Sequence, residues 1–197
     1  MRYDAEHKEK TRKKVLRVAA NAIRAEGPHK IAVAGIMAQA GLTHGGFYAH
    51  FASKDDLVVE AIGQMFEDGK SRFDRSTEGR APAAALSNYI DFYLSDEHRV
   101  SRSMGCPLAA LSADLPRLPE AARERFSQGV AALTRLIAGK LAELGRPDAD
   151  ELGASMIAEL VGSLSLARAV SDDAQAETIL NHSRQALKAR LGLEALS

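Results

Sequence analysis

The stretch GLTHGGFYAHFASKDDL, residues 41–57, decides how the rest of this 197-residue chain is interpreted. Two adjacent glycines, Gly45 and Gly46, interrupt a segment that otherwise has the composition of a helix. Each costs roughly 0.8–1 kcal/mol relative to alanine in a helix interior. Two histidines and a tyrosine surround the pair, at positions that a hydrophobic core could not use. The stretch therefore favours a surface role in which the backbone comes close to a partner.

The composition predicts an all-α fold. Hydrophobic residues make up 46% of the chain and charged residues 26%, which is an ordinary globular balance. Valine and isoleucine never alternate with polar residues as they would in a strand, and the abundant alanine and leucine favour helix. No apolar stretch approaches the roughly 20 residues that span a bilayer, and no signal peptide is visible. A single cysteine is typical of a reducing compartment, so we expect a cytoplasmic protein without a membrane partner.

Charge is unevenly distributed along a chain that is neutral overall. Residues 1–55 contain ten Lys/Arg and five Asp/Glu, whereas the complete sequence contains 26 of each. Four of the six histidines also lie in this N-terminal part. A basic N-terminal part on an acidic body indicates a polyanionic partner at one end of the molecule, although a solvated basic face is the simpler explanation if charge stands alone.

Apolar periodicity and capping residues place the helices in order. Ser53 and Asp56 have the spacing of a capping box, with Asp56 in the place usually taken by glutamate. Pro82 suits the first turn of a helix, and Gly41 suits a helix end. A further short helix is expected to start near Cys106. The other expected helices span about residues 11–26, 31–40, 43–51, 53–75, 82–94, 119–144, 149–170 and 172–191.

The two short helices at 31–40 and 43–51, joined by a tight turn at Gly41, match the helix-turn-helix pattern. In such a unit the second helix lies in the major groove of DNA, with its first residues at the base edges. His44 is the best candidate to read a base, because it is the only long polar side chain at the leading end. Thr43 offers a helix cap or a phosphate contact. The residues expected further along the phosphate backbone are Tyr48, His50 and Lys54.

The segment AGLTHGGFYAHFASKDDLVVEAI, residues 40–62, resembles the DNA-binding signature of the TetR family of transcriptional regulators. That signature has Ala-Gly, Val or Leu, Ser or Thr, a pair of small residues, an apolar residue, Tyr, a variable residue, His or Tyr, and Phe. After a spacer it continues with Ser or Asn, Lys, an acid and Leu. Every one of these positions is filled in this chain, and the resemblance extends back to about Thr11.

The resemblance implies a domain organisation and a set of partners. A DNA-binding domain would span residues 1–52, and a larger helical domain for ligand binding and dimerisation would span residues 53–197. It implies a homodimer through the helices near 149–170 and 172–191, a double-stranded DNA operator, and a small-molecule effector that releases it. Thr43, Tyr48, His50 and Lys54 fall on the positions that contact the DNA backbone. The positions that read bases are occupied by His44, Gly45 and Gly46.

Two departures from the family pattern concern the first helix of the helix-turn-helix. Ala32 stands where Ser or Thr usually starts this helix and touches phosphate, and Ala34-Gly35 replaces a polar or charged pair. We therefore expect His44 and the N-terminal arm to carry more of the DNA binding. The arm can enter the minor groove or only add counterion release. Its basic residues are Lys8, Lys10, Arg12, Lys13 and Lys14.

The expected effector pocket has apolar walls, each of which a core role would also explain. Cys106 precedes Pro107 at an expected helix start, with Arg99 and Arg102 nearby, and such surroundings favour the reactive thiolate. The chain is therefore either a reversible ligand binder or a sensor of electrophiles and oxidants, and a small buried hydrophobe is the plain alternative for this cysteine. The expected pocket residues are Phe66, Tyr89, Tyr93, Met104, Cys106 and Phe126.

Two other functional classes fit the sequence less well. A helical enzyme is not expected, because the chain lacks a metal-binding spacing, a phosphate-binding loop and a Ser/His/Asp arrangement, so no cofactor is predicted. His98 and Cys106 could be imagined as a nucleophilic pair, but the sequence shows no third residue to complete it. A protein that coats DNA without regard to sequence would need a broad basic surface, which a neutral chain does not offer.

Overall fold

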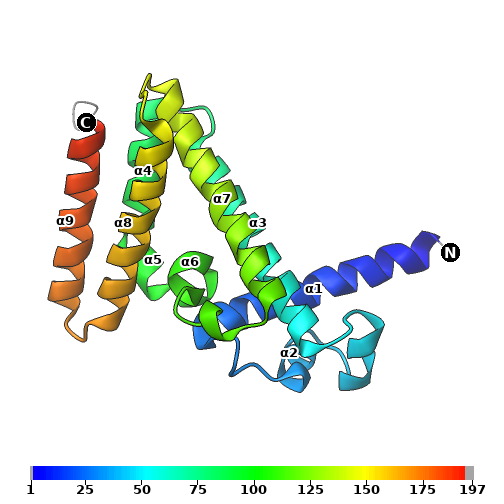
Figure 1. Ribbon diagram of the computed structural model, residues 1–197. Helices are drawn as coiled ribbons and strands as arrows, with labels where there is room; N and C mark the ends of the chain where they lie inside the picture. The colour runs from blue at the N-terminus through cyan, green and yellow to red at the C-terminus, as the bar shows by residue number, and fades with distance from the viewer. Residues whose placement is uncertain (1, 194–197) are drawn as a thin grey trace.

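The computed structural model describes residues 2–193, and every regular element in that range is helical (Figure 1). An N-terminal unit contains three of these elements, and α3 leads from it into the body of the molecule. These four elements are α1 (Arg2–Glu26), α2 (Val33–Gln39), the 3-10 helix η1 (His44–Ala49) and α3 (Lys54–Thr77). The remaining elements are α4 (Pro82–Tyr93), α5 (Asp96–Val100), η2 (Arg102–Met104), α6 (Pro107–Leu111), η3 (Leu115–Arg117), α7 (Glu120–Glu143), α8 (Ala149–Ala169) and α9 (Asp173–Leu191).

Apolar residues that recur at helical spacing along α1 form the core of the N-terminal unit. Val15, Ala19 and Ile23 have no exposed surface, and they belong to the same buried cluster as Met37 of α2 and Phe47 of η1. Gly41 ends α2 with a φ of +72°, a left-handed conformation that glycine adopts without strain. The predicted helix-turn-helix order is confirmed.

Two elements of the N-terminal unit differ from the sequence prediction. Helix α1 begins at Arg2 rather than near Thr11. Apolar periodicity does not predict the added turns, because residues 6–10 are exposed and bury no apolar face. An ion pair between Glu9 and Lys13 accompanies this extension, four residues apart. The segment that follows the turn forms a 3-10 helix, His44–Ala49, in keeping with the low α-helical propensity of its two glycines.

Helix α3 connects the two parts of the molecule. Ser53 caps its start as predicted, because Ser53 Oγ accepts from the Asp56 amide at 3.0 Å. Asp56 Oδ2 accepts from the Ala52 amide at 3.0 Å, one residue before the Ser53 amide that a capping box would use. The helix then runs for 24 residues, packs on α1 at one end and lies along α7 at the other. A displacement of α3 relative to α7 would therefore reach the N-terminal unit directly.

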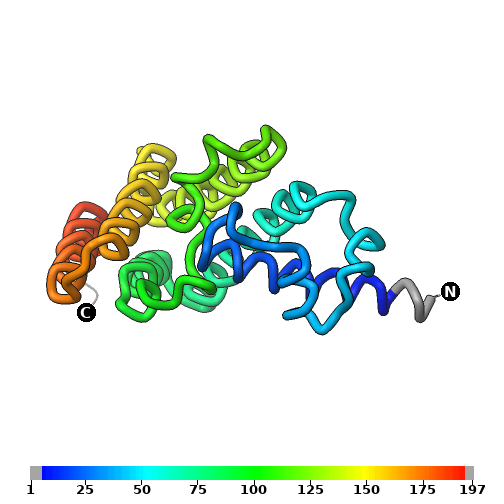
Figure 2. The backbone as a smooth tube through the Cα atoms, turned by 90° about the horizontal axis from the view of Figure 1, so that it is seen from below, coloured from blue at the N-terminus to red at the C-terminus, as the bar shows by residue number. Residues whose placement is uncertain are grey.

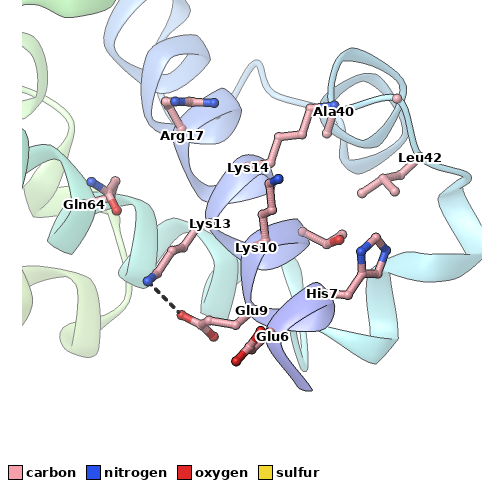
Figure 3. Close-up of a pocket in the computed structure, with 12 residues that line it drawn as sticks. Glu6, His7, Glu9, Lys10, Lys13, Lys14, Arg17, Ala40, Leu42 and Gln64 are labelled. Atoms are coloured by element: carbon pink, nitrogen blue, oxygen red, sulfur yellow. Dashed lines mark ion pairs between the residues drawn. The ribbon is translucent and has the colours of Figure 1, made fainter. Parts of the chain in front are cut away.

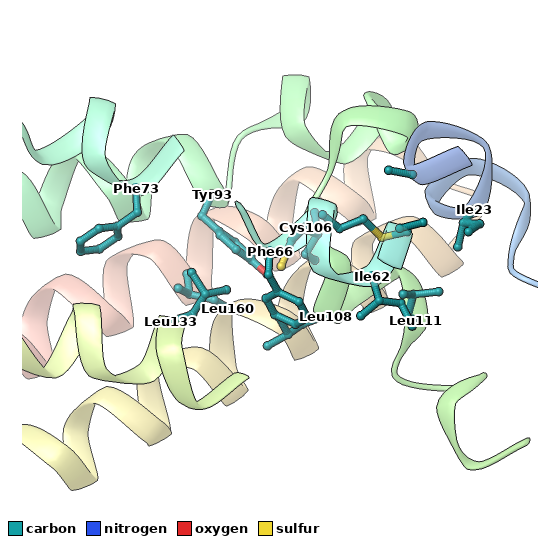
Figure 4. Packing of buried hydrophobic residues seen from close by; sticks show 14 of the residues in the cluster. Ile23, Ile62, Phe66, Phe73, Tyr93, Cys106, Leu108, Leu111, Leu133 and Leu160 are labelled. Atoms are coloured by element: carbon teal, nitrogen blue, oxygen red, sulfur yellow. The ribbon is translucent and has the colours of Figure 1, made fainter. Parts of the chain in front are cut away.

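The body is built from long helices, with α8 and α9 at the end of the molecule farthest from the N-terminus (Figure 2). Gly153 lets α8 approach α7 closely, since a Cβ at this position would lie 3.2 Å from Ala138 Cβ. Figure 4 shows part of the buried cluster, in which side chains from the N-terminal unit and from the body belong to one continuous core. The stretch 95–104, expected to be irregular, contains α5 and η2, and Ser95 caps α5 by accepting from the His98 amide.

Helix α8 corrects the expectation that no apolar stretch is long enough to cross a membrane. By length and composition alone it qualifies, with a mean hydropathy of 1.2. A single helix of this kind is weak evidence for a membrane span, because helices that pack inside folded proteins pass the same test. Only 33% of its apolar window is buried within this chain.

Candidate nucleic-acid interface

The outer face of η1 presents the predicted base-reading residues to solvent. His44 and Gly45 are exposed, and Tyr48 is 72% exposed, which is unusual for a side chain of this size. Phe47 points the opposite way and is 1% exposed, stacked on Phe51 with ring centroids 5.5 Å apart. The core therefore orients η1 and leaves its polar side chains outward.

The two glycines of η1 are not required by contacts within the protein. A Cβ at Gly45 would meet nothing within 4 Å, and one at Gly46 would lie in ordinary contact, 3.7 Å from Met37 Cε. Both residues also have negative φ angles, so backbone strain does not select glycine here. The space beside Gly45 is open to solvent, whereas the space beside Gly46 lies toward Met37 and Thr43.

The other predicted DNA contacts lie beside η1. Thr43 precedes the element, and its hydroxyl makes no capping bond, so it remains available to a partner. Lys54 reaches only a weak bond to the His29 carbonyl oxygen, at 3.5 Å. His50 is half-buried, with an Nδ1 that has no hydrogen-bond partner among the described residues. Burial, and then the positive charges of Lys8 and Arg12, lower the pKa of His50.

A groove of about 1080 Å³ runs between the N-terminal turns of α1 and the turn of the helix-turn-helix (Figure 3). Lys14 extends toward this turn, with its Nζ 3.6 Å from where a Cβ of Gly41 would lie. Lys10 and Arg17 line the same groove, and Lys13 is paired with Glu9. The groove thus brings cations of α1 next to the turn of the helix-turn-helix.

The expectation for one arm residue is corrected. Arg12 donates to both carboxylate oxygens of Glu60 on α3, and its guanidinium lies 5.1 Å from the centroid of the Phe51 ring. It fastens α1 to α3 and is not free for DNA. Helix α2 also offers few polar groups for contacts with DNA. Its N-cap residue Ala32 makes no side-chain hydrogen bond, and the exposed residues that follow include Ala34 and Gly35.

The residues predicted for an effector pocket are only partly brought together. Phe66, Tyr89, Tyr93 and Cys106 are buried in one cluster, and Tyr89 and Tyr93 meet edge to face with centroids 5.9 Å apart. Half-buried Phe126 meets Phe66 with centroids 5.5 Å apart. Met104 lies elsewhere: it is 50% exposed on η2, because its carbonyl oxygen is held by Arg72 and its side chain points away from the core.

The Tyr93 hydroxyl is a buried polar group without a hydrogen-bond partner among the described residues. Burial raises the pKa of Tyr93 well above its ordinary value, and the neighbouring Cys106 adds to this effect. An unpaired buried hydroxyl is uncommon, because it loses its bonds to water without replacement. The group is therefore available to an acceptor brought by a ligand.

His98 is a structural residue that sequence reasoning did not identify as such. Its Nδ1 lies 2.7 Å from the Tyr93 carbonyl oxygen, and its Nε2 lies 3.1 Å from the Cys106 amide nitrogen. Because a carbonyl can only accept and an amide can only donate, Nδ1 carries the proton and Nε2 accepts. Both nitrogens are occupied, so His98 cannot act as a base on the Cys106 thiol. In the sequence, the only hint of this structural role is that His98 lies between Tyr93 and the predicted helix start at Cys106.

Comparisons with known proteins give one consistent result. Residues 15–61 match a family described as bacterial regulatory proteins of the tetR family. Residues 82–182, just over half of the chain, match the C-terminal domain of LmrA/YxaF-like transcriptional regulators. A curated relative, the uncharacterised HTH-type transcriptional regulator YfiR of Bacillus subtilis, is 26% identical over 86 residues. That match covers 44% of this chain and 42% of the relative, so less than half of either protein is compared.

Solved structures resemble the whole fold. A TetR transcriptional regulator from Chloroflexus aurantiacus has a TM-score of 0.80 and 26% identity, with 95% of this chain and 96% of that chain covered. A TetR-family regulator from Agrobacterium tumefaciens has a TM-score of 0.76 and 21% identity, covering 91% and 98%. The reduced form of NemR from E. coli has a TM-score of 0.79 and 18% identity, covering 91% and 96%. At the last two identities the likeness concerns the fold alone.

Proposed function

Because this chain belongs to the TetR family of bacterial transcriptional regulators, we propose that it is a homodimeric repressor that a small molecule releases from an inverted-repeat operator. The observation that carries the proposal is the outer face of η1, where His44 and Tyr48 are exposed on an element fixed from behind by Phe47 and Phe51. A rigid support with outward polar groups suits sequence-specific binding. A cytoplasmic location follows from an operator on the chromosome.

The proposed DNA contacts divide into two groups. His44 reads a base edge in the major groove, while Gly45 and Gly46 let the backbone approach the DNA. Phosphate contacts hold the unit in register but carry no sequence information themselves. They are assigned to Thr43, Tyr48, His50 and Lys54. Exposed cations of α1 add salt-dependent affinity, with Arg12 replaced in that role by its neighbours Lys10 and Lys14.

The proposed dimer forms through α8 and α9, and the apolar face of α8 supports it. Leu166 is 59% exposed, and Ala158 and Ala169 are also exposed along the same helix. An isologous helical interface would cover this face and would set the distance between two η1 elements. Half-sites one helical turn apart would then match the dimer.

The proposed effector acts on the body through the cluster that contains Phe66, Tyr89, Tyr93, Cys106 and Phe126. The unpartnered Tyr93 hydroxyl supports a ligand with a hydrogen-bond acceptor. A ligand of this kind favours a conformation with a different spacing of the two DNA-binding units, at a coupling free energy of typically 1–3 kcal/mol. Exposed Met104 is the weakest member of the predicted set, unless the segment that carries it moves inward.

A sensor that reacts through Cys106 is the second candidate, and its position as the N-cap residue of α6 favours it. Burial opposes it, since the cysteine is 5% exposed and its neighbour His98 is not free to take the thiol proton. Release of DNA by hydrogen peroxide separates the two candidates. Unchanged release in Cys106→Ser would exclude the cysteine sensor. We propose no enzymatic activity for the pair.

Selection of bound duplexes from a random DNA pool, at near-physiological salt, tests the proposed function. We expect an enriched inverted repeat. His44→Ala should relax the preference at one base pair in each half-site, at a cost of about 1–3 kcal/mol. Lys30→Ala, on the exposed loop before α2, serves as a control and should keep the preference. Steeply salt-dependent binding without an enriched motif would instead support a protein that coats DNA.

A further inference from the structure

A second groove, of about 330 Å³, lies between α3 and α7 in the body of the molecule. Its apolar floor is formed by Phe66 and Leu133, each 6% exposed, together with half-buried Leu136. Its rim carries Arg125 and Arg135 of α7. The volume is at the lower end of the range of small-molecule sites, roughly 300–1,000 Å³.

Glycines on both helices shape this groove. A Cβ at Gly129 would lie 2.2 Å from the Phe66 ring, and a Cβ at Gly63 would lie 2.5 Å from the Arg125 guanidinium. Phe66 can therefore lie on α7 only because residue 129 is glycine, whereas the Arg125 guanidinium occupies the space that a side chain at residue 63 would take. Figure 4 places Phe66 and Leu133 in the buried cluster, so the floor of the groove is also the surface of the core.

The charges of the groove favour an anion. Neither Arg125 nor Arg135 has a hydrogen bond or an ion pair within residues 2–193 of the structure. Lys70 and Glu67 also line the groove, and Lys70 is already paired with Asp74 at 2.6 Å. The groove is thus lined by two guanidinium groups and one carboxylate without a bonded partner among the described residues, above an apolar floor. Guanidinium groups bind carboxylates through paired, charge-assisted hydrogen bonds.

We propose that this groove binds an amphipathic monocarboxylate, whose carboxylate is held by Arg125 and Arg135 and whose apolar part covers Phe66, Leu133 and Leu136. These residues recur along one face of α7, with Arg125, Gly129, Ala132 and Leu136 three or four positions apart. A neutral molecule of the same shape would leave the two guanidinium groups without a partner. A cation would be repelled.

The regulatory meaning of the site rests on the proposed function. A ligand inserted between α3 and α7 would press on the helix that begins at Lys54, beside the helix-turn-helix. The DNA-binding unit would then move with the N-terminal end of α3. Binding itself requires none of this, so the site can be tested without DNA.

Isothermal titration calorimetry of the full chain with decanoate and with 1-decanol is the direct test. Decanoate should bind with one site per chain, and at least tenfold more tightly than 1-decanol, because hydrogen bonds between charged groups are stronger than those to a neutral hydroxyl. Titration with 2-naphthoate distinguishes an aryl from an acyl body. Equal affinity for decanoate and decanol, or no binding of either carboxylate at millimolar concentration, would overturn the proposal.

Substitutions in and beside the groove test whether decanoate binds there. Arg125→Gln and Arg135→Gln should each weaken decanoate binding about tenfold. Arg123→Gln, an exposed position on α7 outside the groove, is the matched control and should change it less than twofold. Equal losses in all three variants, or in none, would show that decanoate does not use this groove. Because two independent arginines are tested, a folding defect in one leaves the other decisive.

The same ligand can be added to the protein bound to its selected duplex. Loss of DNA affinity in the wild-type protein but not in Arg125→Gln would connect the groove to repression. Binding of decanoate without any change in DNA affinity would uphold the site and would count against ligand-controlled repression through it. These outcomes therefore distinguish a wrong ligand site from a wrong proposed function.

Discussion

At the scale of single residues, His98 shows how burial selects one protonation state. The ring is 4% exposed, stacks on Phe92 and donates to the Tyr93 carbonyl oxygen while accepting from the Cys106 amide. Burial lowers the pKa of His98 to about 4; the bond to Tyr93 opposes this effect, and the charges of Arg168 and Arg72 add to it. A second proton would have to sit on Nε2 and would break the bond to Cys106.

The stability of the protein should therefore depend on pH through His98. Above its ordinary pKa of 6.5 both folded and unfolded chains hold the neutral ring. As the pH falls from 6.5 to about 4, the unfolded chain takes up a proton that the folded chain does not, so the free energy of unfolding falls. The expected loss is about 3 kcal/mol, measured by urea denaturation across this window.

Two variants isolate the contribution of His98 to this pH dependence. His98→Gln should be less stable at pH 7 but should lose less stability between pH 6.5 and 4. His182→Gln, at an exposed position on α9, is the control and should keep the wild-type slope. A slope for His98→Gln that equals the wild-type slope would mean that other groups cause the acid sensitivity.

At the scale of elements, the segment 94–104 is held by arginines from both parts of the molecule. On the body side, Arg184 of α9 donates to the Leu94 carbonyl oxygen at 2.7 Å. Arg168 of α8 donates to the carbonyl oxygens of His98 at 2.8 Å and Arg99 at 3.1 Å. These carbonyl groups lie at the C-terminal ends of α4 and α5, where a helix leaves its last carbonyl groups unpaired, and the arginine side chains satisfy them.

Arginines of α1 and α3 hold the other end of this segment. Arg24, 3% exposed, donates to Asp68 at 2.7 Å and reaches the Ser103 carbonyl oxygen at 3.5 Å, while Arg72 donates to the Met104 carbonyl oxygen. The segment therefore lies between the proposed dimer helices and the helix that supports the helix-turn-helix. It forms a second connection between these parts, in addition to α3.

Removing the anchor on α8 tests this connection. Arg168→Met should increase amide hydrogen exchange in residues 98–106 and also in the C-terminal end of α1, residues 20–27. Loss of two charge-assisted hydrogen bonds should also lower the free energy of unfolding by about 2–3 kcal/mol. Hydrogen exchange followed by mass spectrometry measures both regions in one experiment.

The matched control for Arg168→Met is Arg190→Met. Arg190 pairs with Glu159 between α9 and α8 at 2.9 Å, and among the described residues it has no hydrogen bond or ion pair with the segment. The Arg190→Met substitution should leave amide hydrogen exchange in residues 20–27 unchanged. If Arg168→Met affects only α8 and residues 98–106, the segment does not transmit changes to α1.

At the scale of the whole molecule, the apolar face of α8 is the feature that a single chain does not account for. Leu166 is 59% exposed at the end of the molecule opposite the N-terminus, although α8 is the most apolar long helix described. This exposed apolar surface supports the proposed interface, because contiguous apolar surface favours a partner. A second copy of the chain is the partner that the family implies.

Leu166→Glu should convert the proposed dimer to a monomer. A charge in the middle of an apolar helical interface costs several kcal/mol when it is left without a partner, so the sedimentation coefficient should fall to that of a single chain. Ala131→Glu, on the exposed face of α7, adds the same charge elsewhere and should leave the mass unchanged. A Leu166→Glu protein that still sediments as a dimer would place the interface on another face.

Much of the candidate DNA surface could be predicted because its signals are local. The capping residues Ser53 and Asp56, the turn at Gly41 and the spacing of Phe47 and Phe51 each depend on neighbours within a few positions. The effector residues were harder to predict, since a buried aromatic side chain in a core and one in a pocket have the same helical spacing. The Tyr93 hydroxyl is fully buried without a hydrogen-bond partner among the described residues, a feature that no sequence pattern reveals.

By itself, the sequence determined the helical class, the order of the helices and the outward face of the helix-turn-helix, because periodicity, capping and turn residues act within one or two helical turns. Only the tertiary structure decided that Arg12 is committed to Glu60 and that Met104 lies outside the core. It also decided that Phe66 rests on Gly129 beneath two free arginines. The physical reason is that these outcomes depend on contacts between residues far apart in the chain, and chain-local spacing does not specify which distant side chains meet.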